Sequence, residues 1–373
     1  MDLQTILRSI RRADIDYDLI ADGDRIAVGV SGGKDSMVLL SALHMYSKFK
    51  GKNFQVVGIH IKLGFPNMDF REVVSYCEQL GIEFHIIDSK VYEILQKHPD
   101  ANGNIKCSLC SKFKKATVIE AAKQFNCHKV AFGHHSDDAV ETLLMNAIFG
   151  GKLAVFLPKM YMSRTDITFI RPLIYAFEED ILTAQQKNNI PYVESTCPND
   201  GFTQRQEMKD MLHEFYKKYP EIKVIVRQSG DLKIKKWIDR GEVDLAITPS
   251  SVIHDNTFFP LHKTPLVCMA PKDYFPLNGK TITIEDLKML PIILQSEGYD
   301  TEPLKYLLDN GLSIDSNFRI ESDDACRALV EHGFGFCITP KTAALCNSQN
   351  INIFSLVPVS YRTIGLVTVY PKY

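Results

Sequence analysis

The chain has 373 residues, more than one domain usually contains, so two domains are expected. With 45% apolar and 24% charged residues and a net charge of −2, its composition is that of an ordinary globular protein. No apolar run is long enough to cross a bilayer and residues 1–4 do not open a signal peptide, so we expect a cytoplasmic protein without a membrane partner. Nine cysteines are too few for a disulfide scaffold at this length.

The small net charge hides a local excess of basic residues. Between residues 101 and 171 there are ten Lys or Arg and five Asp or Glu, a net of +5, so the rest of the chain sums to −7. A patch of this size can orient a polyanion. A solvated basic face beside an acidic one is the alternative interpretation.

Residues 31–36 form the most distinctive stretch, between a buried-strand pattern at 25–30 and a helix pattern at 36–43. Paired glycines allow a tight turn that brings backbone N–H groups close to an anion, and a helix N-terminus attracts negative charge. The spacing is not that of an ordinary nucleotide P-loop. It resembles the SGGKDS signature of PP-loop pyrophosphatases, which adenylylate a substrate; a tight turn with solvated residues is the alternative. The resemblance implies that ATP binds at Ser31, Gly32, Gly33, Lys34, Asp35 and Ser36.

Strand and helix patterns alternate around this loop. We expect a helix at 3–21, a strand at 54–61, a helix at 70–80 and a strand at 84–87. This alternation predicts βαβ units and a parallel sheet with ligands at the carboxyl ends of its strands. His60 lies at such an end, where it could approach the adenine or the activated atom.

Two cysteines, Cys107 and Cys110, stand at the start of a predicted helix that reaches residue 125. One helical turn brings two such thiols together, so the pair can ligate one metal centre. Half a zinc site, an iron–sulfur site, a redox dithiol and two unremarkable cysteines all fit this spacing. The basic residues Lys112, Lys114 and Lys115 follow directly.

A further polar cluster follows a predicted strand at 129–132 and precedes a predicted helix at 139–149. It contains Gly133, His134, His135, Asp137 and Asp138. These groups could hold magnesium, position a phosphate or serve as acid and base. A helix N-cap is the structural alternative for the first aspartate, and magnesium is expected because a pyrophosphate leaving group needs charge neutralisation.

Over residues 3–216 the chain resembles the tRNA 2-thiocytidine synthetases, relatives of the 2-thiouridine synthetases within the PP-loop group. The motifs that carry the resemblance lie at residues 23–26, 31–36, 107–111, 133–138, 149–152, 170–173, 204–206 and 211–212. In that family a CxxC pair and one distant cysteine bind a 4Fe–4S cluster with one open iron. The resemblance therefore implies that Cys107, Cys110 and Cys197 bind such a cluster.

Three thiolates with an open site suit a cluster that exchanges a ligand, whereas structural zinc requires four protein ligands. The family often has another cysteine where this chain has Glu194, but three ligands suffice. Lys114 matches a basic residue thought to assist catalysis in the uridine-thiolating relatives; contact with the tRNA backbone or a solvated helix face are its alternatives. The remaining cysteines are expected in the core: Cys77, Cys127, Cys268, Cys326, Cys337 and Cys346.

The strand and helix pattern restarts after residue 219, with a predicted strand at 223–226, a helix at 231–240 and a strand at 243–248. The run at 241–247, with softer motifs at 266–271, 284–293 and 329–335, resembles the effector-binding domain of LysR-type regulators over residues 220–370. Such domains are built like periplasmic binding proteins, with two lobes that close on a small molecule. No winged helix-turn-helix precedes it, so DNA binding is not implied.

Hydroxyl groups would line the cleft of such a domain. We expect a carboxylate or sulfur oxyanion to be bound there, although ordinary turn chemistry is the alternative interpretation. The candidate effector residues are Ser229, Thr248, Ser250 and Ser296.

Together these patterns predict an α/β protein with two domains. Residues 1–216 would form a PP-loop domain with a parallel sheet, of the adenine nucleotide α-hydrolase-like type, and residues 217–373 a two-lobed domain like the periplasmic binding proteins. The predicted reaction is thiolation of a tRNA base, most simply C2 of a cytidine, after its oxygen attacks the α-phosphate of ATP. Sulfide on the open iron would then attack C2. Asp35 would orient metal and phosphates, Lys34 would neutralise phosphate charge, and Asp137 or Asp138 would assist the metal or a proton transfer.

The predicted partners are tRNA, a sulfur donor system such as a cysteine desulfurase, and a small-molecule effector at the C-terminal domain; a homodimer is left open. Two other functions also fit the sequence. The chain could act on a small sulfur-containing metabolite received by the C-terminal domain, or it could be a non-enzymatic sensor of nucleotide and redox state. An intact SGGKDS loop with three matching cysteines argues against the sensor.

Overall fold

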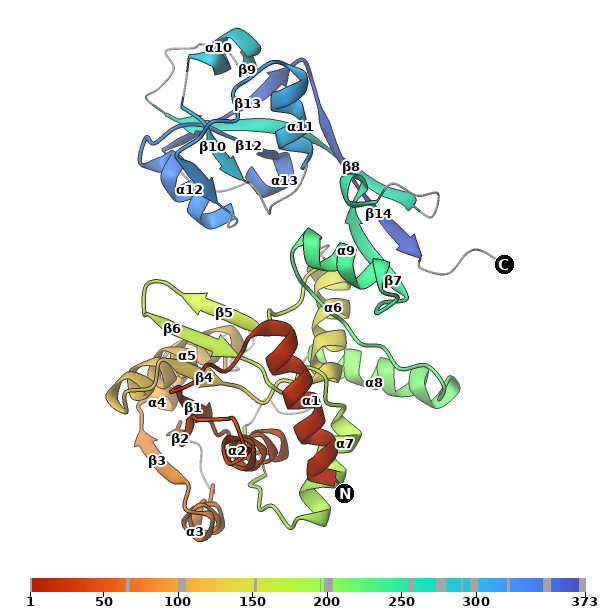
Figure 1. The fold of residues 1–373 in the computed structure, drawn as a ribbon. Helices are drawn as coiled ribbons and strands as arrows, with labels where there is room; N and C mark the ends of the chain where they lie inside the picture. The colour runs from red at the N-terminus through yellow and green to blue at the C-terminus, as the bar shows by residue number, and fades with distance from the viewer. Residues whose placement is uncertain are drawn as a thin grey trace. The chain divides into compact units, whose positions relative to one another are not determined.

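The computed structural model describes residues 2–64, 68–99, 105–150, 153–194, 196–197, 204–253, 258–272, 280–289, 291–295, 301–320, 323–344 and 350–368. The chain divides into two compact units, Met1–Gln228 and Ser229–Tyr373 (Figure 1). Among the described residues, no helix combines the length and the apolar character that a membrane span requires.

The first unit is a six-stranded sheet with the order β3-β2-β1-β4-β6-β5. Five strands are parallel, and β5 is antiparallel at the edge. The predicted parallel sheet is therefore confirmed, with an antiparallel edge strand that the sequence analysis did not predict. The strands are β1 Arg25–Gly29, β2 Gln55–Lys62, β3 Glu83–Asp88, β4 Lys129–Ala131, β5 Lys159–Met162 and β6 Ile167–Ile170.

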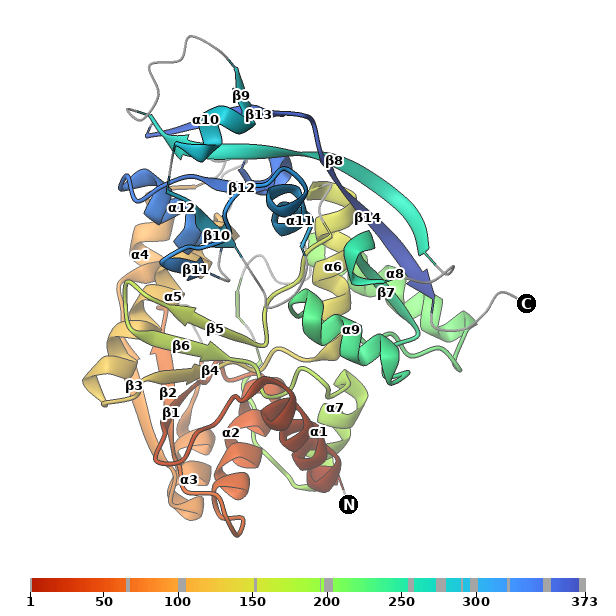
Figure 2. The same cartoon turned by 45° about the horizontal axis from the view of Figure 1, so that its top comes forward.

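Helices cover both faces of this sheet, because consecutive residues of its strands are apolar and point to opposite faces. In β1, Ile26 and Val28 pack in one core, and Ala27 packs in the other. The first core also includes α1 Asp2–Tyr17, α2 Lys34–Ser47, α3 Arg71–Leu80 and α7 Glu178–Lys187, and the second includes α4 Val91–Gln96 and α5 Cys107–Gln124 (Figures 1 and 2). The unit also contains α6 Ser136–Gly150 and α8 Gln204–Lys218.

The strand order reverses between β1 and β4, because the chain adds β2 and β3 on one side of β1 and later strands on the other. Open parallel sheets bind ligands at such a switch point, outside the carboxyl ends of the strands. The loop at 30–33 and the loop at 132–135 both leave the sheet there. The fold therefore brings the two main polar motifs of the first half together.

The second unit contains one mixed sheet, β7-β14-β8-β13-β9, with β12 also paired to β8, and a two-stranded parallel sheet, β10-β11. The long strands β8 Phe258–Pro271 and β14 Tyr361–Thr368 run from β7 Leu245–Pro249 and α9 Asp231–Asp239 into the larger part of the unit (Figure 1). The other elements are η1 Ser250–Val252, β9 Thr281–Thr283, α10 Ile284–Lys288, β10 Ile293–Gln295, α11 Glu302–Asp309, β11 Phe318–Ile320, α12 Asp323–Glu331, β12 Cys337–Pro340, α13 Lys341–Ala344 and β13 Ile351–Val357.

The prediction of a strand at 223–226 is wrong. These residues have no strand partner in the described part of the chain, and the segment belongs to the first unit. Val226 packs against the core of that unit, and the ammonium of Lys223 lies 5.0 Å from the ring centre of Phe177. Packing on a neighbouring surface therefore replaces the sheet pairing that the pattern suggested.

The described cysteines outside the predicted metal set lie in the cores, as expected: Cys77, Cys127, Cys268, Cys326 and Cys337 are buried. Cys346 lies outside the described residues.

Candidate active site

The loop expected to bind ATP is shaped by a glycine that no other residue could replace without strain. Gly32 has a φ of +98°, and a Cβ there would lie 2.9 Å from the ring of Phe70. Its carbonyl accepts a hydrogen bond of 2.9 Å from the amide of Val193. The backbone turn is therefore fixed from two sides.

Hydroxyl groups hold the rest of the loop and leave the helix N-terminus open. The Ser36 hydroxyl donates to the Gly33 carbonyl at 2.8 Å and lies 3.2 Å from the hydroxyl of the exposed Ser31. α2 begins at Lys34, and no side chain of the described residues caps it at Gly33. First-turn N–H groups without a cap are suited to an anion, so this cradle fits the phosphates of ATP.

Gly133 brings the second loop directly against the first. A Cβ at Gly133 would lie 3.1 Å from the backbone of Asp35 and Ser36, so a side chain there would require the two loops to move apart by a few tenths of an ångström. The pKa values of the next two residues shift in opposite directions. Burial lowers the pKa of His134 to about 4, which keeps its ring neutral, and its Nδ1 has no hydrogen-bond partner among the described residues. Although burial opposes it, the carboxylate of Asp137, 3.5 Å from the Nδ1 of His135, raises the pKa of His135, and the charges of Asp138 and Asp35 add to the effect.

The two aspartates of this motif are engaged by their neighbours. α6 starts at Ser136, earlier than the predicted residue 139, so both carboxylates lie in its first turn. Asp138, not the first aspartate, accepts the amide of His135 at 3.0 Å and so fills the capping role. Asp137 accepts the amide of Glu178 at 2.8 Å, which ties α6 to the start of α7.

Three charged residues that the sequence analysis did not select complete this cluster. Glu178 accepts hydrogen bonds from Lys34 at 2.9 Å and from Lys209 of α8 at 2.8 Å. Arg205, also on α8, lies 3.7 Å from a carboxylate oxygen of Asp138. The signal for these residues was weak, because the spacing of Arg205 and Lys209 by four on one helix is common on solvated faces.

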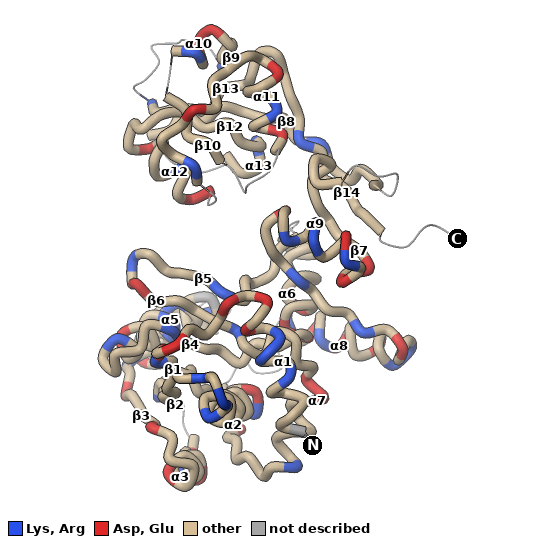
Figure 3. Tube along the Cα trace, viewed as in Figure 1, with Lys and Arg blue, Asp and Glu red and all other residues tan. Residues whose placement is uncertain are grey.

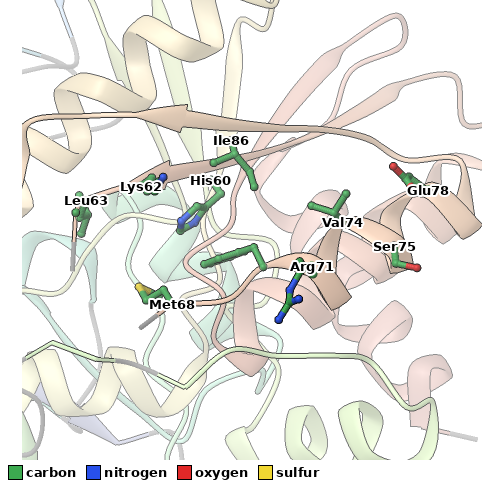
Figure 4. Close-up of a pocket in the computed structure, with 11 residues that line it drawn as sticks. His60, Lys62, Leu63, Met68, Arg71, Val74, Ser75, Glu78 and Ile86 are labelled. Carbon is green, nitrogen blue, oxygen red and sulfur yellow. The ribbon is translucent and has the colours of Figure 1, made fainter. Parts of the chain in front are cut away.

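A cavity of about 400 Å³ opens beside His60, at the carboxyl end of β2 (Figure 4). The Nδ1 of His60 lies 2.8 Å from the Val30 carbonyl, and since a carbonyl only accepts, Nδ1 carries the proton and Nε2 is an acceptor. Burial lowers the pKa of His60, so this neutral form persists at neutral pH. Among the apolar residues that line the cavity are Leu63, Met68 and Phe70, whose ring centre lies 3.7 Å from that of His60.

The three cysteines expected to bind a cluster lie in one neighbourhood. Burial raises the pKa of Cys110, the charge of Lys114 opposes the increase, and the charges of Cys107 and Cys197 add to it. Cys107 is exposed, and the other two are half-buried. Within the described ranges, no three His, Cys, Asp or Glu side chains are gathered closely enough to hold one metal ion. The donor chemistry thus fits an iron–sulfur cluster, but the thiols do not form a coordination shell.

The basic residues after the cysteine pair point in different directions. Lys112 and Lys114 are exposed on α5. Lys115 is half-buried, with its ammonium 4.7 Å from the ring centre of Phe169, and burial lowers its pKa. Lys115 therefore packs against the protein, and the expectation that it meets a tRNA backbone is not supported by its position.

The candidate effector residues of the second unit differ in how deeply they are buried. Thr248 is buried within β7, and its hydroxyl has no hydrogen-bond partner among the described residues. Ser229 is half-buried just before α9, and Ser250 is exposed at the start of η1. Ser296 lies outside the described residues.

Arg362 of β14 joins two helix starts near η1, a residue that the sequence analysis missed. It donates to Asp231, the first residue of α9, at 3.0 Å, and lies 3.8 Å from Glu302, the first residue of α11. The hydroxyl of Ser251 in η1 is buried without a hydrogen-bond partner among the described residues. The second unit thus contains unsatisfied hydroxyls together with an arginine held by two carboxylates.

Glu141 should make the stability of the protein pH-dependent. Burial and the charge of Asp138 raise its pKa from 4.5 to about 7, against the opposing charge of Arg205. The native state therefore favours the protonated form, and the stability this contributes is present below pH 4.5 and is lost as the pH rises through 7. The substitution Glu141→Gln removes this loss of stability at high pH. Relative to wild type, the variant should gain about 3 kcal/mol between pH 4.5 and pH 8.

Urea unfolding followed by circular dichroism at the two pH values measures this gain. Glu120→Gln changes an exposed carboxylate on α5 and should show no pH-dependent difference from wild type. An equal effect of Glu141→Gln at both pH values would contradict the assignment.

Comparisons with known proteins find two different families along the chain. A family model described as "PP-loop domain" matches residues 4–214, and one described as "LysR substrate binding domain" matches residues 204–372. The tRNA-cytidine(32) 2-sulfurtransferase of Geobacter sulfurreducens is 35% identical over 237 residues, covering 63% of this chain and 92% of the relative. The enzyme of the same name from Geotalea daltonii is 39% identical over 238 residues, covering 63% and 94%.

Two solved structures are also similar. The U34-tRNA thiolase NcsA from Methanococcus maripaludis, with its [4Fe-4S] cluster, has a TM-score of 0.48 and 24% identity over 58% of this chain and 73% of NcsA. The CcmR regulatory domain of Synechocystis PCC6803 with 2-PG has a TM-score of 0.36 and 21% identity, covering 45% of this chain and 84% of that domain. The family models and the curated relatives show that the chain belongs to the PP-loop tRNA-cytidine 2-sulfurtransferase family and carries a LysR substrate-binding domain after it.

Proposed function

We propose that this protein thiolates C2 of a cytidine in tRNA, after activating the base by adenylylation with ATP. The observation that carries the proposal is that His60 joins the two halves of the site. Its ring bonds the carbonyl of Val30, the residue before the ATP loop, while the charge of Lys114 acts on both His60 and Cys110. ATP activation and sulfur delivery would therefore occur at one edge of the sheet.

ATP would lie with its phosphates on the loop and its adenine in the cavity beside His60. The open first turn of α2 would bind the phosphates, and Lys34 would neutralise part of their charge. The apolar walls of the cavity suit a purine, and the Nε2 of His60 would accept a hydrogen bond from its exocyclic amine.

Magnesium would bind at Asp35, in the first turn of α2 and beside the phosphate cradle. Asp137 and Asp138 each already accept a hydrogen bond from a backbone amide. We therefore assign them to shaping the site and balancing the charge of the metal, in preference to proton transfer. His134 is neutral and buried against this loop, and its orphan Nδ1 would hydrogen-bond the nucleotide.

Cys107, Cys110 and Cys197 would hold the 4Fe–4S cluster, which fits their thiol chemistry and their shared neighbourhood. When bound, the cluster would carry the sulfur, supplied by a donor such as a cysteine desulfurase. Lys114 would offset part of the increase in the pKa of Cys110 and would orient the base, and with Lys112 it offers exposed positive charge to the tRNA backbone.

The second unit would bind a small anionic effector and alter the activity of the first. Thr248 and Ser251 have buried hydroxyls without hydrogen-bond partners among the described residues, and Arg362 offers a cation beside η1. A carboxylate or sulfur oxyanion would accept hydrogen bonds from these hydroxyls, and it would compete with Asp231 for the guanidinium of Arg362. Different affinities for this ligand in two conformations would suffice to regulate the enzyme.

Deleting the gene should remove 2-thiocytidine from total tRNA, as measured by mass spectrometry of nucleosides. Complementation with Asp35→Asn should not restore it, because the neutral amide cannot neutralise the metal charge at the phosphate cradle. Asp22→Asn, an exposed change in the turn before β1, is the matched control and should restore it fully. Unchanged 2-thiocytidine in the deletion strain would contradict the proposal and favour the small-metabolite enzyme.

Replacing Cys197→Ala should lower the iron content of anaerobically purified protein and its absorption near 400 nm by more than about half, because two thiolates hold a 4Fe–4S cluster poorly. Cys77→Ala removes a buried core cysteine of α3 and should keep the iron content of wild type. Equal iron in the Cys197→Ala protein would refute the three-ligand assignment.

Sulfate should change the fluorescence of Trp237 saturably at constant ionic strength. Trp237 is the single tryptophan of the chain and is buried on α9 of the second unit, so it reports on that unit alone. Arg362→Gln should weaken the sulfate response by about tenfold, the size of one lost charge-assisted hydrogen bond. Arg319→Gln, which changes an exposed arginine of β11, is the control. Equal sulfate responses in wild type, Arg362→Gln and Arg319→Gln would contradict the assigned site.

A further inference from the structure

Two ammonium groups share one carboxylate beside the ATP loop. A single oxygen of Glu178 accepts hydrogen bonds from Lys34 at 2.9 Å and from Lys209 at 2.8 Å. Lys34 also lies 3.0 Å from a carboxylate oxygen of Asp35. The ammonium expected to meet the phosphates of ATP is therefore already held by two carboxylates.

The position of Lys209 is fixed by the packing of α8. Met208 and Leu212 of this helix are buried, which turns the face between them toward the first unit. One turn earlier, Arg205 donates to the hydroxyl of Thr142 at 3.0 Å and lies 3.5 Å from Glu141 of α6. Charged residues occur along the length of α8 (Figure 3), but Arg205 and Lys209 are the ones that these contacts anchor to the site.

Glu178 and Lys34 are both charged at neutral pH. Burial alone would raise the pKa of Glu178, but the hydrogen bonds from Lys209 and Lys34 lower it to about 2. Burial opposes the charge of Lys34, yet Asp35 and Glu178 raise its pKa overall. The side chain of Glu178 is only 27% exposed, so losing a partner would leave a poorly solvated negative charge.

We propose that Lys209 is a positioning residue for the ATP loop, because it keeps Glu178 paired when Lys34 turns to the phosphates of ATP. Without Lys209, the move of Lys34 would leave Glu178 as an unpaired, half-buried carboxylate. Glu178 would then hold Lys34 back, and ATP would bind more weakly. This inference rests on the proposed ATP site and adds that the last helix of the first unit takes part in it.

Calorimetric titration of the full chain with α,β-methylene-ATP and Mg²⁺ tests the inference. Lys209→Met should raise the dissociation constant about tenfold, as expected for one lost charge-assisted partner. In tRNA thiolation it should raise KM for ATP with kcat within about twofold, because the reacting atoms are untouched. Lys209→Arg keeps the cation and should restore binding, and Lys217→Met, an exposed change on the same helix, is the control.

A double-mutant cycle provides the decisive comparison. With Glu178→Gln there is no carboxylate for Lys209 to compensate, so adding Lys209→Met should change the dissociation constant by less than about twofold. Additive effects, or wild-type affinity in Lys209→Met, would overturn the inference. Lys209→Gln offers a polar replacement with the same prediction if the methionine variant does not fold. A wild-type protein that binds no α,β-methylene-ATP would instead refute the proposed function together with this inference.

Discussion

The site depends on a close approach between two backbones at the switch point of the sheet. Gly133, after β4, lies against the peptide of Asp35 and Ser36 at the start of α2, where any Cβ would be 3.1 Å from backbone atoms. Because β1 and β4 are adjacent and parallel, their following loops leave the same edge. The absent side chain then lets the histidine and aspartate motif contact the phosphate cradle. A side chain at this position would move this motif away from the loop proposed to bind ATP by a few tenths of an ångström.

The charges at this edge are arranged in pairs that hold one another in place. Asp137 fixes the start of α7, Asp138 caps α6, and Glu178 links the ATP loop to α8. His134 and His135 are neighbours in sequence, but their pKa values shift in opposite directions, because burial lowers that of the first and neighbouring carboxylates raise that of the second. A polyanionic substrate therefore meets a site whose cations are already oriented, which reduces the reorganisation needed when it binds.

Local patterns predicted the parts of the site that lie within one loop or one helix turn. The SGGKDS loop, the CxxC helix start and the end of β4 were found because their residues are contiguous. Glu178 was missed because its partner Lys34 is 144 residues away in sequence and a glutamate at a helix start is common. The segment 223–226 was assigned to a strand because alternation reports an extended backbone but not what the chain packs against. Sequence patterns thus identify the chemistry, whereas the pairing of distant charges requires the fold.

α8 is the element where the two halves of the chain meet in sequence. The PP-loop model ends at residue 214 and the LysR model begins at residue 204, so both include the first part of this helix. Its buried residues Met208 and Leu212 and its cations Arg205 and Lys209 all engage the first unit. The segment that follows also binds there, since Arg227 lies over the ring of Tyr175. The helix that precedes the second unit in sequence is therefore the one whose Lys209 contacts Glu178, which in turn accepts a hydrogen bond from the lysine of the ATP loop.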